Sequence, residues 1–143
     1  DRIALHPATR FIATMNFGYA GTRELNEALV SRFMVINMPP VNEETLSRLL
    51  ESAFPDVKKE PLRQLCGLFL DLQTKAKNGE ISTKAIDLRG LMGALKMMRG
   101  GLAPLKAVNM GITNKSFDGF EREMIADIVM TRIPASWTSK DVF

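Results

Sequence analysis

The sequence predicts a mainly α-helical fold with a small α/β remnant at its N-terminal end. From residue 42 onward, apolar residues recur at steps of three and four, which is typical of amphipathic helices. Before that point, two continuous apolar runs at residues 10–16 and 33–38 flank a short helical pattern, as expected for strands covered on both faces. Pro39 and Pro40 separate the two patterns, so we predict one domain over residues 1–40 and a helical domain over 41–143.

The N-terminal elements follow from local signals. The run at residues 10–16 predicts a strand, and Gly18 and Gly21 allow sharp turns in the loop that follows. Residues 24–31 predict a short helix with Leu25, Ala28 and Leu29 on one side. The run at 33–38 predicts a second strand that the prolines end.

The rest of the chain contains five helical patterns bounded by capping or breaking residues. They cover approximately residues 43–53, 61–77, 83–99, 104–110 and 119–132. Ser82 is expected to cap the third helix, and Asp118 with Glu121 resembles a capping box for the last. The buried face of that last helix is expected to include Phe120. The tail from Ala135 is expected to be loosely held, and the sequence does not decide whether Trp137, Val142 and Phe143 dock on the bundle or on a partner.

Composition narrows the function classes. With 45% hydrophobic and 24% charged residues, the chain has the make-up of a globular protein. Its apolar runs are far shorter than the roughly 20 residues that a membrane span requires. The single Cys66 can form no internal disulfide, and one cysteine with one histidine, His6, makes a transition-metal site improbable. We therefore expect a cytoplasmic protein without a membrane span or a bound metal.

A net charge of +3 permits nucleic-acid binding without indicating it, because basic residues are spread among acidic ones. Nucleic acid is accordingly an unlikely partner. One alternative nevertheless stays open, namely a helical nucleic-acid-binding or protein-adaptor module without catalysis.

Residues 10–33, RFIATMNFGYAGTRELNEALVSRF, carry a more specific signal. Their apolar run ends in Asn16, a YAGT-type loop and LNEAL follow, and the helix closes with Arg32 before Phe33. This string resembles the second half of a AAA+ ATPase core, in the MoxR-like and dynein-related branch. Phe17 departs from the pattern, because a Pro often follows the Asn in that family.

The resemblance implies roles for individual residues. Asn16 would be sensor 1, which together with Thr14 lies beside the γ-phosphate and orients the attacking water. Arg32 would be the arginine finger that reaches the nucleotide of a neighbouring subunit, and Arg23 is a weaker candidate for that role. The planar guanidinium suits Arg for stabilising charge on a transferring phosphoryl group.

A third role implied by the resemblance is sensor 2, a lid cation that contacts the phosphates. Ser82-Thr83-Lys84-Ala85 resembles the family's S-P-R-A or S-T-R pattern, with Lys84 in place of the usual Arg. Arg89 is the rival candidate. On one continuous helix the two would lie roughly 140° apart, so they could not both face one phosphate group.

The motifs that hold nucleotide are missing from these residues. There is no G-x-x-x-x-G-K-[ST] loop to bind phosphates and no acidic strand end to bind Mg²⁺. The sequence therefore predicts the C-terminal portion of a larger ATPase, with ATP and Mg²⁺ bound by the full-length parent and no cofactor bound by this piece. The resemblance further implies a self-assembled ring, expected to be a hexamer, that remodels or matures a client protein.

Overall fold

A computed structural model describes residues 3–15 and 26–143 of the chain. The chain divides into two units, Asp1–Pro39 and Pro40–Phe143. Within the described part of the first unit, the one helix is α1 (Glu27–Val30), which Asn26 caps by accepting a hydrogen bond from the Ala28 N–H.

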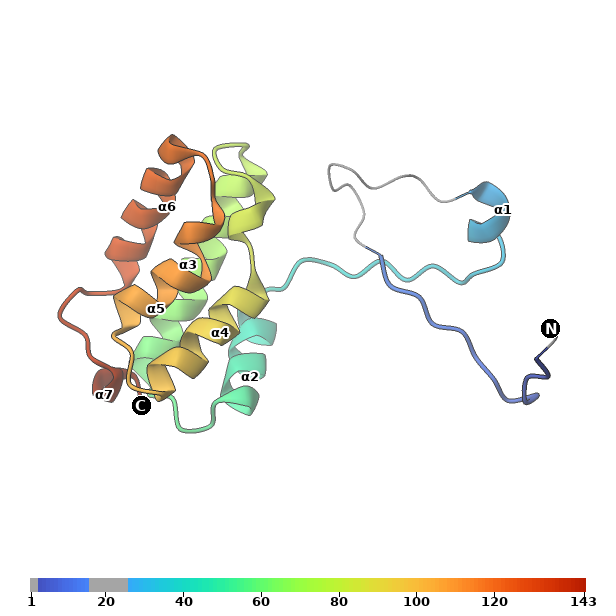
Figure 1. The fold of residues 1–143 in the computed structure, drawn as a ribbon, viewed down its shortest axis with the longest axis horizontal. Coiled ribbons are helices and arrows are strands. Elements are labelled where there is room, and N and C mark those ends of the chain that lie inside the picture. The colour runs from blue at the N-terminus through green and yellow to red at the C-terminus, as the bar shows by residue number, and fades with distance from the viewer. Residues whose placement is uncertain (1–2, 16–25) are drawn as a thin grey trace. The chain divides into compact units, whose positions relative to one another are not determined.

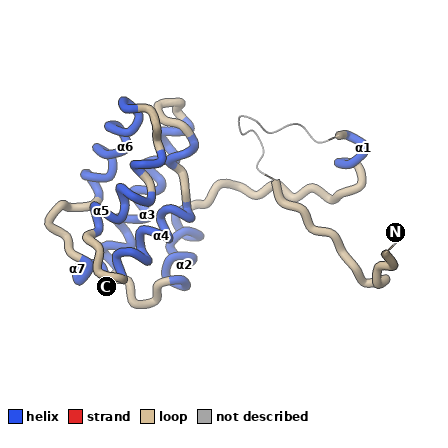
Figure 2. The backbone as a smooth tube through the Cα atoms, viewed as in Figure 1, coloured by secondary structure: helices blue, strands red, loops and turns tan. Residues whose placement is uncertain are grey.

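The second unit is a helical bundle (Figures 1 and 2). Its α-helices are α2 (Glu43–Ala53), α3 (Lys59–Lys77), α4 (Leu88–Arg99), α5 (Pro104–Gly111), α6 (Gly119–Arg132) and α7 (Ser139–Val142). Two short 3-10 helices, η1 (Thr83–Ala85) and η2 (Thr113–Lys115), precede α4 and follow α5. Figure 2 shows helices and loops only in this unit.

Capping residues fix the ends of the first two helices of the bundle. The Asn42 side chain accepts a hydrogen bond from the Thr45 N–H at 2.9 Å, which satisfies one of the free donors at the start of α2. After α3, Gly79 has a φ of 76°, a conformation in which a side chain would be strained. These helices confirm the predictions for residues 43–53 and 61–77.

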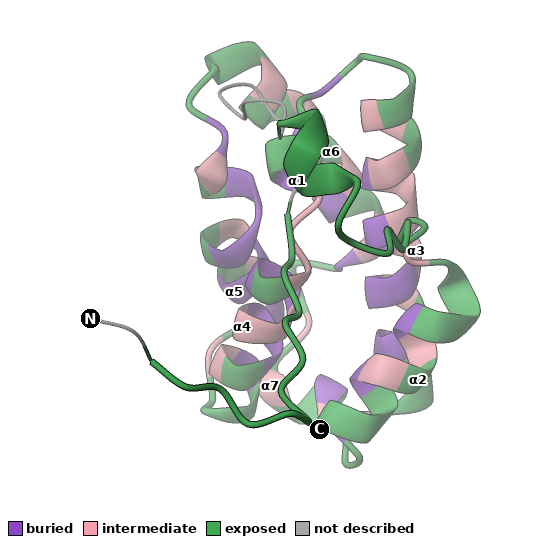
Figure 3. Ribbon diagram, turned by 90° about the vertical axis from the view of Figure 1, so that its right-hand side faces the viewer, coloured by how far each residue is buried: buried purple, intermediate pink, exposed green. Residues whose placement is uncertain are grey.

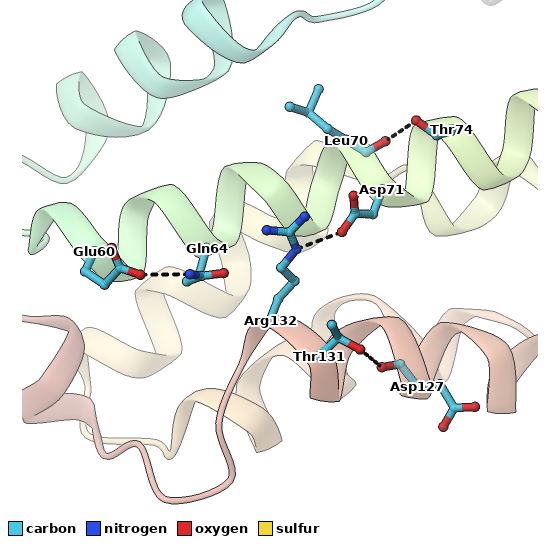
Figure 4. Close-up of polar contacts among 8 residues, drawn as sticks. All are labelled: Glu60, Gln64, Leu70, Asp71, Thr74, Asp127, Thr131 and Arg132. Carbon is cyan, nitrogen blue, oxygen red and sulfur yellow. Dashed lines mark hydrogen bonds and ion pairs between the residues drawn. The ribbon is translucent and has the colours of Figure 1, made fainter.

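Helix α3 lies at the centre of the bundle, where it contacts α2, α6, α7 and η1. Its inward residues are fully or almost fully buried, as Figure 3 shows for the inner sides of the helices. They are Pro61, Leu62, Leu65, Cys66, Leu68, Phe69 and Leu72. At its outer edge, the Arg132 Nε of α6 donates to the Asp71 carboxylate at 2.8 Å, which ties α6 to α3 (Figure 4).

The α4–α5 pair is packed backbone to backbone. A Cβ added to Gly90 would overlap the Gly111 carbonyl oxygen, and a Cβ on Gly111 would overlap the Gly90 carbonyl oxygen. The two helices therefore approach more closely than helices with side chains at the crossing can.

The C-terminal segment is docked on the bundle, so the prediction of a loose tail from Ala135 was wrong. Val142 is buried, and its carbonyl accepts a hydrogen bond from the Lys58 N–H at 2.8 Å. The Arg99 guanidinium lies 5.0 Å from the Phe54 ring centroid and 5.3 Å from that of Phe143. Such cation–π contacts, which local sequence does not reveal, hold the segment in place.

The predicted α/β remnant is not present, because no strand occurs in residues 3–15 or 26–143. Residues 10–15 and 33–38 are irregular and largely exposed, whereas the sequence predicted strands there. An apolar run indicates that a segment needs cover, but it does not determine the backbone conformation that covers it. The fold class is therefore all-helical over the described residues.

Two details of the helical predictions also need correction. Helix α4 begins at Leu88 with Asp87 as its N-cap, and Ser82 precedes only the short η1. In α6, Ile125 and Val129 form the buried face, while Phe120 is 74% exposed. Phe120 lies about 140° around the helix from Ile125. Because α6 buries Ile125, it exposes Phe120.

Candidate functional site

The predicted sensor 1 and arginine finger fall in the first unit. Asn16 and Arg23 lie outside the described residues, and Thr14 is exposed in an irregular stretch. Arg32 follows α1, where its backbone N–H donates to the Leu29 carbonyl at 3.1 Å. Its side chain is exposed and makes no ion pair with any residue that the structure describes.

The predicted sensor 2 segment lies in the second unit, where η1 contacts η2. Glu121 of α6 links the two, because its carboxylate accepts hydrogen bonds from the Ser116 hydroxyl at 2.5 Å and from the Ser82 N–H. The hydrogen bond from Ser116, followed by that from Ser82, lowers the pKa of Glu121. Glu121 thus fixes η1 instead of closing the predicted capping box, although Asp118 does cap the Glu121 N–H at 2.8 Å.

Asp87 fixes the start of α4. Its carboxylate accepts from the Gly90 N–H at 3.0 Å and forms an ion pair with Lys115 of η2. Burial alone would raise the pKa of Asp87, but the Lys115 ammonium and the Gly90 N–H outweigh it and lower the pKa. Both ends of the segment from Ser82 to Asp87 are therefore held by charged hydrogen bonds.

Lys84 and Arg89 differ in their surroundings. The Lys84 ammonium lies 5.8 Å from the centroid of the exposed Phe117 ring. Arg89 is exposed in the first turn of α4, and none of the hydrogen bonds or ion pairs within the described residues involves its side chain. Because η1 ends before α4 begins, the two cations are not on one helix, and the predicted separation of 140° does not apply to them.

Sequence reasoning missed the residues that hold this segment. Asp87, Lys115 and Glu121 come from three separate parts of the chain, and their contacts depend on how the helices pack. One local signal was available for Asp87, because Asp is as good an N-cap as Ser and lies directly before the apolar positions of α4.

Neither a metal site nor a reactive thiol occurs among the described residues. They contain no group of three or more His, Cys, Asp or Glu side chains that could hold a metal ion. Cys66 is 2% exposed, and burial raises the pKa of its thiol to about 11, so it is an inert core residue. In the same residues, no helix is long and apolar enough to cross a membrane.

Comparison with known proteins finds relatives but gives no family. The chain is 34% identical over 122 residues to the uncharacterized protein YojN of Bacillus subtilis, a match that covers 84% of this chain and 39% of the relative. It is 31% identical over 126 residues to an uncharacterized protein of Staphylococcus aureus, covering 86% of this chain and 46% of the relative. No protein-family model and no solved structure matches.

The matches reach into both units of the chain but cover only part of each relative. A match over 122 residues is longer than the second unit, so it includes part of the first. The chain spans less than half of the length of either relative.

Proposed function

We propose that the chain is part of an ATPase of the AAA+ superfamily, similar to its MoxR-like and dynein-related branch. In this proposal residues 1–40 supply Asn16 as sensor 1 and Arg32 as the arginine finger, and residues 41–143 form the helical lid. The full-length parent binds ATP and Mg²⁺ through residues outside this chain. It acts in the cytoplasm as a ring, expected to be hexameric, that remodels or matures a client protein.

The observation that carries the proposal is the exposure of the apolar segments around the resemblance. Ile12, Met34 and Ile36 are 91%, 96% and 81% exposed. Large apolar side chains that are exposed next to one another, such as Met34 and Ile36, are typical of an interaction site. A larger ATPase would cover these segments with the polypeptide that carries its phosphate-binding half.

The surroundings of the two lid cations favour Arg89 as sensor 2. Lys84 lies against the Phe117 ring, and its charge also contributes to the lowered pKa of Glu121. Arg89 has no such partner among the described residues and lies where the backbone N–H groups of α4 favour an anion. Its guanidinium can also bind phosphate oxygens in a bidentate way, which an ammonium cannot.

The decisive experiment uses the full-length parent. Arg32→Ala should lower kcat for ATP hydrolysis by a factor on the order of 10³–10⁵, the range for arginine fingers, and leave the Kd for ATP unchanged. Arg48→Ala is the matched control, because it removes an exposed helical arginine that pairs, among the described residues, with Glu44 alone. Normal turnover in the Arg32 variant would exclude the assigned role. The chain alone is expected neither to bind ATP tightly nor to hydrolyse it.

A second candidate function is a nucleic-acid-binding or adaptor module. One observation favours it: residues 88–117 contain no Asp or Glu, while Arg89, Lys96 and Lys106 are exposed there. Such a surface should bind duplex or single-stranded DNA with an affinity that falls steeply with salt. A gel-shift titration at two salt concentrations, alongside the ATPase assay, distinguishes the two functions.

A further inference from the structure

Helix α6 carries an unpartnered stripe on its outer side. Phe120, Glu123, Asp127 and Met130 lie within about 80° of the helix circumference. Phe120 and Met130 are 74% and 57% exposed, and both carboxylates are exposed and form no ion pair with a described residue. Figure 4 shows the Asp127 carboxylate directed away from α3. Each carboxylate thus has an exposed apolar side chain one turn away on the same face.

A surface of the opposite charge lies on α5. An open hollow of about 430 Å³ is lined by Leu105, Lys106 and Met110, among others, and by no carboxylate. Lys106 and the half-exposed Met110 are four residues apart, so a cation and an apolar side chain are neighbours on this face. Lys96, on the adjacent α4 but not in the lining of the hollow, is a second exposed cation without an ion pair to any described residue.

We propose that the α6 stripe of one copy of this chain docks on the α5 hollow of a second copy. Glu123 and Asp127 would face Lys106 and Lys96, and Phe120 or Met130 would fill the hollow beside Met110. The two surfaces have the same make-up, an apolar side chain one turn from a charge, with charges of opposite sign.

The proposed function already includes a ring of copies, and this proposal adds a specific pair of surfaces that requires neither nucleotide nor the residues assigned to hydrolysis. The α6 stripe and the α5 hollow are formed by different residues, so each copy carries both surfaces. Such a contact is heterologous and builds rings or open chains. Because exposed charges contribute, the association should weaken as salt rises and the Debye length shrinks.

The test measures the mass of the chain by sedimentation velocity across protein and salt concentrations, without nucleotide. The wild type should associate as its concentration rises, and more strongly at low salt. The charge reversals Glu123→Lys with Asp127→Lys, and separately Lys96→Glu with Lys106→Glu, should each raise the Kd roughly tenfold or more. An equimolar mixture of the two variants should restore association, because each variant then meets its complement.

Two controls separate loss of the contact from unfolding and from a general effect of net charge. All four substituted side chains are exposed, and far-UV circular dichroism confirms that each variant is folded. Glu43→Lys with Glu51→Lys, two exposed acids on α2, changes the net charge equally and should leave association unchanged.

Several results would overturn the proposal. Association that persists in both reversal variants would come from another surface, such as the apolar segments of the first unit. Failure of the mixture to associate would show that the charges do not meet across the contact. A monomeric wild type that binds DNA through Lys96 and Lys106 would assign the basic surface to nucleic acid. None of these results depends on ATP hydrolysis, so they leave the ATPase proposal to its own experiment.

Discussion

At the scale of single residues, the crossing of α4 and α5 depends on two glycines. Gly90 and Gly111 face each other, and a Cβ on either would overlap backbone of the other helix, which cannot yield as the end of a side chain can. Gly93, one turn further along α4, has no atom within 4 Å of its would-be Cβ. One helix therefore contains a glycine that the packing requires and a glycine that it does not.

Gly90→Ala should lower the free energy of unfolding by about 1–3 kcal/mol, because the two helices must separate to admit the methyl group. Gly93→Ala is the matched control and should raise it by about 0.5–1 kcal/mol, because alanine is the better helix former. Urea denaturation followed by circular dichroism measures both. Equal effects of the two substitutions would contradict the close crossing.

The different surroundings of Lys84 and Arg89 could not be predicted from the sequence. Lys84 was a candidate cation because its segment resembles the sensor 2 pattern of the AAA+ family, and Arg89 was its rival. Their difference depends on Phe117 and Glu121, which approach from more than thirty residues away along the chain. No local pattern contains that information.

At the scale of elements, Glu121 joins α6 to η1 and η2. It belongs to α6, accepts from Ser116 beside η2, and accepts from Ser82 beside η1. These hydrogen bonds lower its pKa below the ordinary value of 4.5. Since the folded-state pKa is the lower one, Glu121 stabilises the fold above the unfolded-state pKa, and this contribution is lost as pH falls through the folded-state value.

Glu121→Gln should therefore reduce stability at pH 7 by about 1 kcal/mol, which is less than the roughly 1.5–3 kcal/mol of hydrogen bonds to charged groups because the site is partly exposed. The deficit relative to the wild type should shrink as the pH falls through the lowered folded-state pKa of Glu121, because the wild-type carboxylate then becomes protonated. Denaturation midpoints between pH 3 and 7 give the measurement. The control is Glu123→Gln, in the same helix but without a hydrogen bond from a described residue, and its effect on stability should not change with pH in this way. A pH-independent deficit in the Glu121 variant would contradict the stabilising role of the Glu121 carboxylate.

Elements were predictable where their signals are local. Helices α2, α3 and α5 follow from apolar spacing together with Asn42, Gly79 and Pro104 at their ends. The start of α4 was misplaced because Ser82 and Asp87 can both cap a helix. The four-residue α7 was not predicted, although Thr138 and Asp141 form a capping box within its own sequence. Its docking depends on Phe54 and Arg99, which contact Phe143 and which the local sequence does not reveal.

At the scale of the whole molecule, the two units differ in how they bury apolar surface. The second unit encloses a continuous core, whereas the described residues of the first expose most of their large apolar side chains. The sequence indicated a change of character at Pro39 and Pro40. It suggested strands before that point because an apolar run looks the same whether its cover comes from within the chain or from elsewhere.

Limited trypsin digestion should expose this difference. Cleavage after Arg32 should be rapid, because the backbone of residues 34–40 donates no hydrogen bond to the described backbone. The fragment from Phe33 to Phe143 should then persist, since the next sites lie in or beside α2 and α3. Mass spectrometry over time identifies the products, and degradation of both parts at one rate would contradict the prediction.

The docked C-terminal segment gives the molecule an optical probe of its own. Trp137 is the sole tryptophan of the chain, and it packs against the core between α6 and α7. Its fluorescence therefore senses detachment of that segment, while the far-ultraviolet signal senses loss of helix as a whole. Superimposing the two melting curves shows whether the last residues leave early or remain until the bundle itself gives way.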